Sequence, residues 1–244
     1  MNLPSRRLLL MSLAALALPF APAQAQDNWS VIPNDYVMND ILNRQRIEAA
    51  IGRPIDGSAP RKTAPAPATK PNGSTRYTAT PAVAARVRTQ FVQQIRTTAG
   101  DEAAQKVGAA LNRGDAVKSW NSIVNGDGLR SGDMTDAFAS YVVLHWVMAN
   151  RADSTPAQAM GVRRQVAPVM ATYANLPDAR KQELAETFML NFLLQHAAYV
   201  DALQRNDTVT QGKLSDAAAT RFRKEMGLDL RTLQLSDKGL TPRG

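Results

Sequence analysis

"DMTDAFASYVVLHWVMANRA", residues 133–152, is the stretch that decides the fold. Asp133 is a favourable N-cap residue, and Asp136 places a negative charge in the first turn, where it suits the helix dipole. An apolar stripe repeats at a spacing of four and three residues and consists of Met134, Phe138, Tyr141, His145 and Met148. Five further apolar residues widen this stripe: Val142, Val143, Leu144, Trp146 and Val147. Because the helix is apolar nearly all round, it is predicted to lie buried at the centre of a domain.

A second stretch, residues 178–205, has the same character, since it is apolar on most faces from Phe188 to Val200. Further helices are predicted around these two. One begins after Pro81, and two short helices follow at about 101–112 and 115–124. Another begins near Ser154 and is expected to kink or break at Pro168. The last covers about 211–226 and stops at Gly227. No alternating pattern of useful length predicts a strand.

The expected fold is therefore all-α. A single helical-bundle domain over residues 81–244, with two buried central helices, follows a flexible Pro/Ala-rich tether. Its end, "GLDLRTLQLSDKGL" (227–240), is short and is expected to be irregular.

Three segments carry a resemblance to a known family: "DAFASYVVLHWVMAN" (136–150), the "VRRQV" of the next helix (162–166), and the ending just quoted. Together they resemble a family of exported bacterial helical proteins of unknown function, over about residues 80–240. These motifs are hydrophobic patterns and not chemical signatures. The resemblance therefore implies no catalytic residues.

The chain opens with the features of an export signal. Two arginines precede an apolar run at 8–20, and "AQA" at 23–25 is a small-x-small cleavage site. We expect residues 1–25 to be a signal peptide cleaved after Ala25, and the mature protein to be periplasmic or secreted. The paired arginines leave the general secretory and the twin-arginine routes both open. The absence of cysteine excludes disulfides and thiolate metal sites.

Two segments of different composition follow the signal peptide. Residues 53–80 are rich in Pro, Ala, Ser, Thr and Lys, and cannot bury enough apolar surface to offset their ordering entropy, which predicts a disordered linker. Residues 26–52 are too apolar for a simple tail. The residues of this predicted binding arm are Trp29, Tyr36, Met38, Ile41 and Leu42. The arm either folds back on its own domain or docks on another molecule, and the sequence leaves both open.

The two histidines, His145 and His196, lie on the apolar stripes of the two predicted central helices. One interpretation is a paired site for a metal or a haem between the helices. The other is that each is a neutral core imidazole. The sequence has neither His-Glu-x-x-His nor Cys-x-x-Cys-His, and His196 has Asn191 and Gln195 as polar neighbours. We therefore expect core histidines and no cofactor.

Two further chemistries have candidate residues. "NGDGLRSGDMTD" (125–136) has oxygen-bearing side chains at calcium-loop spacing, but Leu129 and Arg130 stand where an EF-hand needs an oxygen ligand and a glycine. A glycine-rich turn before a capped helix is favoured instead. Glycan hydrolysis needs two carboxyl groups flanking the scissile bond, one of them in an apolar pocket. The candidate acids are Glu102, Glu183 and Glu186. Neither a Gly-x-Ser-x-Gly elbow nor a phosphate loop is present.

The expected function is that of a non-enzymatic exported binding protein, whose partner is an envelope protein or a cell-wall component. The alternatives are an envelope glycan hydrolase of the peptidoglycan type, and a metal or haem carrier through His145 and His196. The net charge of +8 is spread out, without a dense Lys/Arg patch and interleaved aromatics, so nucleic acid is not an expected partner. No membrane span is expected after the signal peptide. The oligomeric state cannot be predicted.

Overall fold

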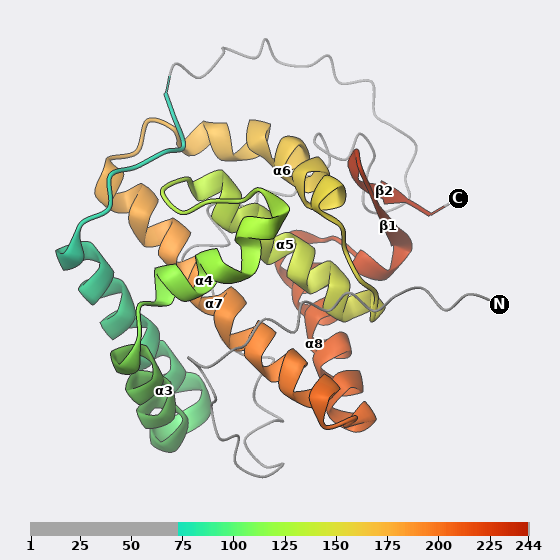
Figure 1. The fold of residues 1–244 in the computed structure, drawn as a ribbon, viewed down its shortest axis with the longest axis horizontal. Helices are drawn as coiled ribbons and strands as arrows, with labels where there is room; N and C mark the ends of the chain where they lie inside the picture. The colour runs from blue at the N-terminus through green and yellow to red at the C-terminus, as the bar shows by residue number, and fades with distance from the viewer. Residues whose placement is uncertain (1–72, 244) are drawn as a thin grey trace.

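The computed structural model describes residues 73–243 (Figure 1). Its elements are α3 (Pro81–Arg113), α4 (Ala116–Val124), η2 (Asn125–Asp127), α5 (Met134–Asn150), α6 (Pro156–Met170), η3 (Ala171–Tyr173), α7 (Asp178–Gln204), α8 (Thr208–Met226), η4 (Leu230–Thr232), β1 (Leu233–Ser236) and β2 (Gly239–Pro242). The all-α prediction is confirmed. The predicted signal peptide, the arm with Trp29, Tyr36, Met38, Ile41 and Leu42, and residues 53–72 lie outside the described residues.

Helix α5 is the centre of the domain, with α6, α7 and α8 packed around it (Figure 1). Its N-cap is Asp133, which accepts a hydrogen bond from the backbone N–H of Thr135 at 2.9 Å. Every residue from Asp133 to Trp146 is buried, as its all-round apolar pattern requires. The neighbouring α7 is buried on most of its faces. The prediction of two buried central helices is therefore confirmed.

One glycine and two prolines lie where the helices break, begin or approach their end. Gly100, with φ of +87°, separates the two halves of α3, because only glycine adopts this conformation without strain. Pro156 opens α6. Pro168 does not split α6 where it stands. The helix continues for two more residues and ends at Met170, where the 3₁₀ turn η3 begins.

The predicted irregular ending is wrong, because residues 233–242 form an antiparallel hairpin with Leu233 paired to Pro242. The strands have four residues each, and only β1 shows the alternation of buried and exposed side chains. A pattern this short carries no usable signal in the sequence. The hairpin depends on distant partners, since the Trp146 indole N–H donates to the carbonyl of Leu233 at 3.0 Å.

One face of α6 packs against this hairpin and hydrogen-bonds to both of its strands. The Gln165 amide both donates to and accepts from the backbone of Leu240, at 2.8 Å each, while the Gln158 amide donates to the carbonyl of Leu235 at 3.0 Å. Between the two glutamines, Gly161 lies so close that a Cβ there would come within 2.6 Å of a backbone oxygen of the hairpin turn. The two glutamines and the close approach at Gly161 therefore hold the hairpin against α6.

The last residues of the predicted linker, 74–80, make hydrogen bonds with the helical domain. The backbone N–H of Tyr77 donates to the carbonyl of Gly132 at 3.0 Å, and that of Met134 to the carbonyl of Thr75 at 3.1 Å. Tyr77 is buried against the core. We call residues 74–80 the strap. None of the helices in residues 73–243 is long and apolar enough to cross a bilayer.

Candidate functional site

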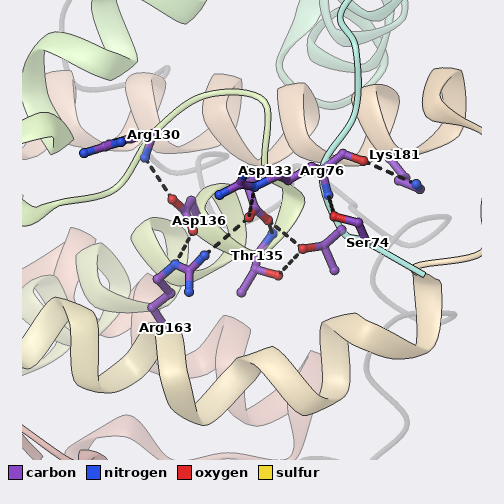
Figure 2. A network of polar contacts seen from close by, with 9 residues as sticks. Ser74, Arg76, Arg130, Asp133, Thr135, Asp136, Arg163 and Lys181 are labelled. Carbon is purple, nitrogen blue, oxygen red and sulfur yellow. Dashed lines mark hydrogen bonds and ion pairs between the residues drawn. The ribbon is translucent and has the colours of Figure 1, made fainter. Parts of the chain in front are cut away.

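A polar network joins the strap, the N-terminal end of α5 and helix α6 (Figure 2). Oδ1 of Asp133 accepts from the Thr75 hydroxyl at 2.7 Å and from the backbone N–H of Thr135 at 2.9 Å. Its Oδ2 accepts from Nη2 of Arg163 at 3.3 Å and lies 4.0 Å from Nε of Arg76. The N-cap of the central helix is thereby also the anchor of the strap.

Asp136 completes this network. Its carboxylate accepts from the backbone N–H of Arg130 at 3.0 Å and from Nε of Arg163. Burial raises the pKa of Asp136, and the contacts with Arg163 only partly offset this effect. The oxygens that the calcium interpretation would require of Asp133 and Asp136 are thus taken up by protein donors. The network holds the domain together and favours the capped-turn interpretation.

The three acids considered for glycan hydrolysis have different surroundings. Glu102 is exposed and pairs with Lys106. Burial opposes ionisation of Glu183, but hydrogen bonds from Arg86 and Arg180 leave its pKa below the usual value. Both acids are ionised members of salt bridges at neutral pH.

Glu186 differs from the other two, because it is buried on α7 and accepts a hydrogen bond from the Gln182 amide at 2.7 Å. Burial raises its pKa, which is the direction that a general acid needs. Gln182 also exchanges hydrogen bonds with the backbone of Thr80, so this acid lies beneath the strap.

A second polar cluster lies inside the core between α5, α7 and α8, and we call it the core cluster. It consists of Tyr141, His145, Gln195, Arg221 and Glu225. The His145 ring centroid is 4.0 Å from that of Tyr141. Nδ1 of His145 lies 2.7 Å from the carbonyl oxygen of Tyr141 and therefore carries the proton, which leaves Nε2 as an acceptor.

Two charges lie in this cluster. Nε of Arg221 is 4.0 Å from Oε1 of Glu225 one turn later on α8, and the two side chains are only 5% and 15% exposed. Burial, and then the charge of Arg221, lower the pKa of His145 to about 3. Burial raises the pKa of Tyr141. At neutral pH the cluster thus holds a neutral imidazole and a neutral phenol beside the Arg221–Glu225 pair.

His196 lies in different surroundings. It stacks on Phe192 with ring centroids 5.5 Å apart, and burial lowers its pKa to about 4. Within residues 73–243, no three His, Asp or Glu side chains gather in a group that could hold a metal ion. A cation at His145 would also face the guanidinium of Arg221. The residues around the two histidines therefore do not fit a metal centre.

Sequence reasoning missed Arg221 and Arg163, the two cations that organise these networks. Arg221 could have been found, because it stands one turn after Ala218 on the face of α8 that also bears Phe222. Arg163 gave no such signal, because its partners lie 27 and 30 residues away along the chain.

The neutral histidines make the domain sensitive to acid. The pKa values of His145 and His196 are about 3 and about 4 in the folded protein, below the 6.5 of an unfolded chain. Between these pKa values and pH 6.5, the unfolded state therefore binds more protons than the folded state. Stability should be full above pH 6.5 and fall below it, by about 1.4 kcal/mol per pH unit for each histidine. Urea unfolding at pH 7.5, 6.0 and 5.0 measures this loss. His145→Gln and His196→Gln should each flatten it, and an unchanged pH dependence in both variants would contradict the assignment.

Comparison with known proteins places the whole chain in one family. The profile described as "Family of unknown function (DUF6683)" matches residues 4–243. The searches of curated proteins and of solved structures found no match. The match covers both networks and the hairpin as well as the central helices. The chain therefore belongs to the family of unknown function DUF6683.

Proposed function

We propose that the chain is an exported, non-enzymatic binding protein. In this proposal the helical domain is the folded body to which the arm is attached, and the apolar arm at residues 26–52 contacts a partner in the cell envelope. Residues 1–25 act as the signal peptide that delivers it to the periplasm or the exterior.

The observation that carries the proposal is the closed surface of the domain. Among the large apolar side chains of residues 73–243, Val209 is the one that lies mostly in solvent, at 69% exposed. Burying a Trp, Tyr, Met, Ile or Leu side chain contributes about 1.5–3 kcal/mol, but only where a matching apolar surface exists. In the part of the chain that the structure describes, the other large apolar side chains are buried or only partly exposed. The arm therefore finds its matching surface on another molecule.

The chemistry of the domain supports a binding role over a catalytic one. Both histidines are buried and neutral, and a catalytic base must reach the proton that it abstracts. Asp133, Asp136 and Glu183 are committed to arginines. These groups serve the fold.

The composition of the linker favours an anionic partner. Residues 53–80 carry Arg53, Arg61, Lys62, Lys70 and Arg76 against a single acid, Asp56. A basic segment beside an apolar arm is attracted to a negatively charged surface. Among the expected partners, an anionic polymer of the cell wall fits this charge best.

Co-sedimentation with purified cell walls tests the proposal. The mature chain should sediment with the walls, and replacement of Trp29, Tyr36, Met38, Ile41 and Leu42 by Ser should abolish sedimentation. A matched control replaces five neighbouring amides, Asn28, Asn34, Asn39, Asn43 and Gln45, by Ser without changing the net charge, and should sediment like the mature chain. Equal sedimentation of all three proteins would reject the arm as the binding segment.

Glycan hydrolysis remains a second candidate because of one observation, the buried Glu186 with its raised pKa. A zymogram on peptidoglycan separates the two functions. The binding proposal predicts no clearing by the mature chain. Clearing that is lost in Glu186→Gln, with the fold retained, would replace the binding proposal by the hydrolase.

A further inference from the structure

The strap is held along one edge by the segment that leads into α5. The backbone N–H of Tyr77 donates to the carbonyl of Gly132 at 3.0 Å, and that of Met134 donates to the carbonyl of Thr75 at 3.1 Å. The strap and residues 132–134 therefore pair over a short stretch as neighbouring antiparallel strands do.

The first turn of α7 holds the other edge of the strap. Nζ of Lys181 donates to the carbonyl of Arg76 at 3.3 Å (Figure 2). The Asp178 carboxylate accepts from the backbone N–H of Thr78 at 2.9 Å. The strap is thus bound from two sides, and largely through its backbone.

The side chains of the strap add little to this attachment. Tyr77 is buried, and Thr75, whose hydroxyl donates to Asp133 at 2.7 Å, is half-buried, while the rest are exposed. Ordering one residue costs about as much free energy as one net backbone hydrogen bond contributes, so the two effects largely offset each other. The burial of Tyr77 therefore decides whether the strap stays in place, and a segment of this kind opens before the core does.

The end of the strap next to α3 is fixed more firmly. The Gln182 amide accepts from the N–H of Thr80 at 2.9 Å and donates to its carbonyl at 3.0 Å, and Thr80 is also the N-cap of α3. The exposed Ala79 lies between this fixed point and the rest of the strap. Outward movement of residues 74–78 would therefore turn about Ala79.

Tyr77 also lies near the buried acid Glu186. Burial, and then the negative charge of Glu186, raise the pKa of Tyr77, which places the phenol near this carboxylate. On α7, the Glu186 carboxylate accepts from the Gln182 amide at 2.7 Å. The strap and its tyrosine thus contribute to the burial of Glu186, and their removal would bring solvent to the acid.

We propose that residues 74–78 are a lid, which swings out about Ala79 while the helices stay folded and gives solutes access to Glu186. The closed lid shields the acid, and the open lid presents it at the surface. This access is what the glycan hydrolase alternative requires of Glu186, since a general acid must reach the atom that it protonates.

Amide hydrogen exchange of the mature protein, followed by NMR at neutral pH, tests the lid. The amides of Tyr77, Thr78 and Met134 lose their acceptors when the lid opens, so all three should exchange through one opening. They should exchange about 100-fold or more faster than the buried amides of α5 and respond little to urea, because the opening exposes little surface. The matched control is Ala137, whose amide donates to the carbonyl of Asp133 within the first turn of α5 and should stay slow. Exchange of all these amides at one rate, with the urea dependence of global unfolding, would reject the lid.

Two variants test what the lid covers. Tyr77→Ala should hold the lid open, so the amides of Thr78 and Met134 lose their protection while the amides in the middle of α5 stay slow. The pKa of Glu186, measured by ¹³C NMR of its carboxyl group, should fall toward its ordinary value, because burial is what raises it. Thr78→Ala removes an exposed side chain, keeps the N–H, and should change neither measurement. An unchanged pKa of Glu186 in Tyr77→Ala, or loss of protection throughout α5, would overturn the proposal.

Discussion

Replacing Phe188 by Ala is expected to lower the free energy of unfolding by about 3–5 kcal/mol, a large part of the stability of a domain this size. Phe188 is fully buried where α7 meets α5. Its ring centroid lies 5.0 Å from that of Phe138 and 5.5 Å from that of Tyr141. Truncation removes the apolar surface of the ring and leaves a cavity, because packed neighbours relax only in part. The midpoint and slope of urea unfolding measure the loss.

Two variants control this experiment. Phe188→Leu keeps most of the volume and should cost much less than Phe188→Ala. Val209→Ala removes a side chain that is 69% exposed and should change the free energy of unfolding by less than about 0.5 kcal/mol. A Phe188→Ala variant as stable as Val209→Ala would mean that α5 and α7 do not form the core.

Replacing Arg163 by Met is expected to cost about 3–5 kcal/mol at pH 7, by a different mechanism. The side-chain stem is kept, but the buried carboxylates of Asp133 and Asp136 lose the guanidinium that both contact. The remaining cation near Asp133 is Arg76, at 4.0 Å and largely exposed. Two negative charges would then face each other at the end of α5, and urea unfolding at pH 7 measures the cost.

The pH dependence distinguishes this mechanism from simple loss of packing. Without Arg163, the pKa of Asp136 should rise further above its usual value, so protonation at lower pH relieves the repulsion. The gap between Arg163→Met and the unmodified protein should narrow from pH 7 to pH 5. Adding Asp136→Asn should recover part of the loss at pH 7. If the double variant is less stable than Arg163→Met, the buried carboxylate is not the source of the cost.

The central helices could be predicted from the sequence because their signal is local. An N-cap at Asp133 and an apolar pattern over fifteen residues fix α5 without knowledge of its neighbours. The burial of His145 followed from the same stripe. The hairpin could not be predicted, because its strands have four residues each and are held by Gln158 and Gln165, about 75 residues earlier in the chain.

The strap lies within the predicted linker, and its contacts with the domain could not be read from its composition. Its composition is polar and matches the Pro-rich segment before it, so it predicts disorder. Its order comes from backbone hydrogen bonds to Gly132 and Met134, and from the Asp178 carboxylate, which accepts from the N–H of Thr78 at 2.9 Å. The composition of a segment indicates how much apolar surface the segment itself can bury. It does not indicate which hydrogen-bond partners distant parts of the chain supply.

The thermal unfolding midpoint of the mature chain, measured with and without residues 26–52, tests most directly whether the arm serves another molecule. An arm that works on a partner leaves the domain unchanged, so the two midpoints should agree within about 2 °C. An arm packed on its own domain would bury several apolar side chains, each of which stabilises the fold by about 1.5–3 kcal/mol. Each kcal/mol of net stabilisation that is lost lowers the midpoint by about 2–4 °C. A midpoint that falls by 5 °C or more without the arm would contradict the proposed role.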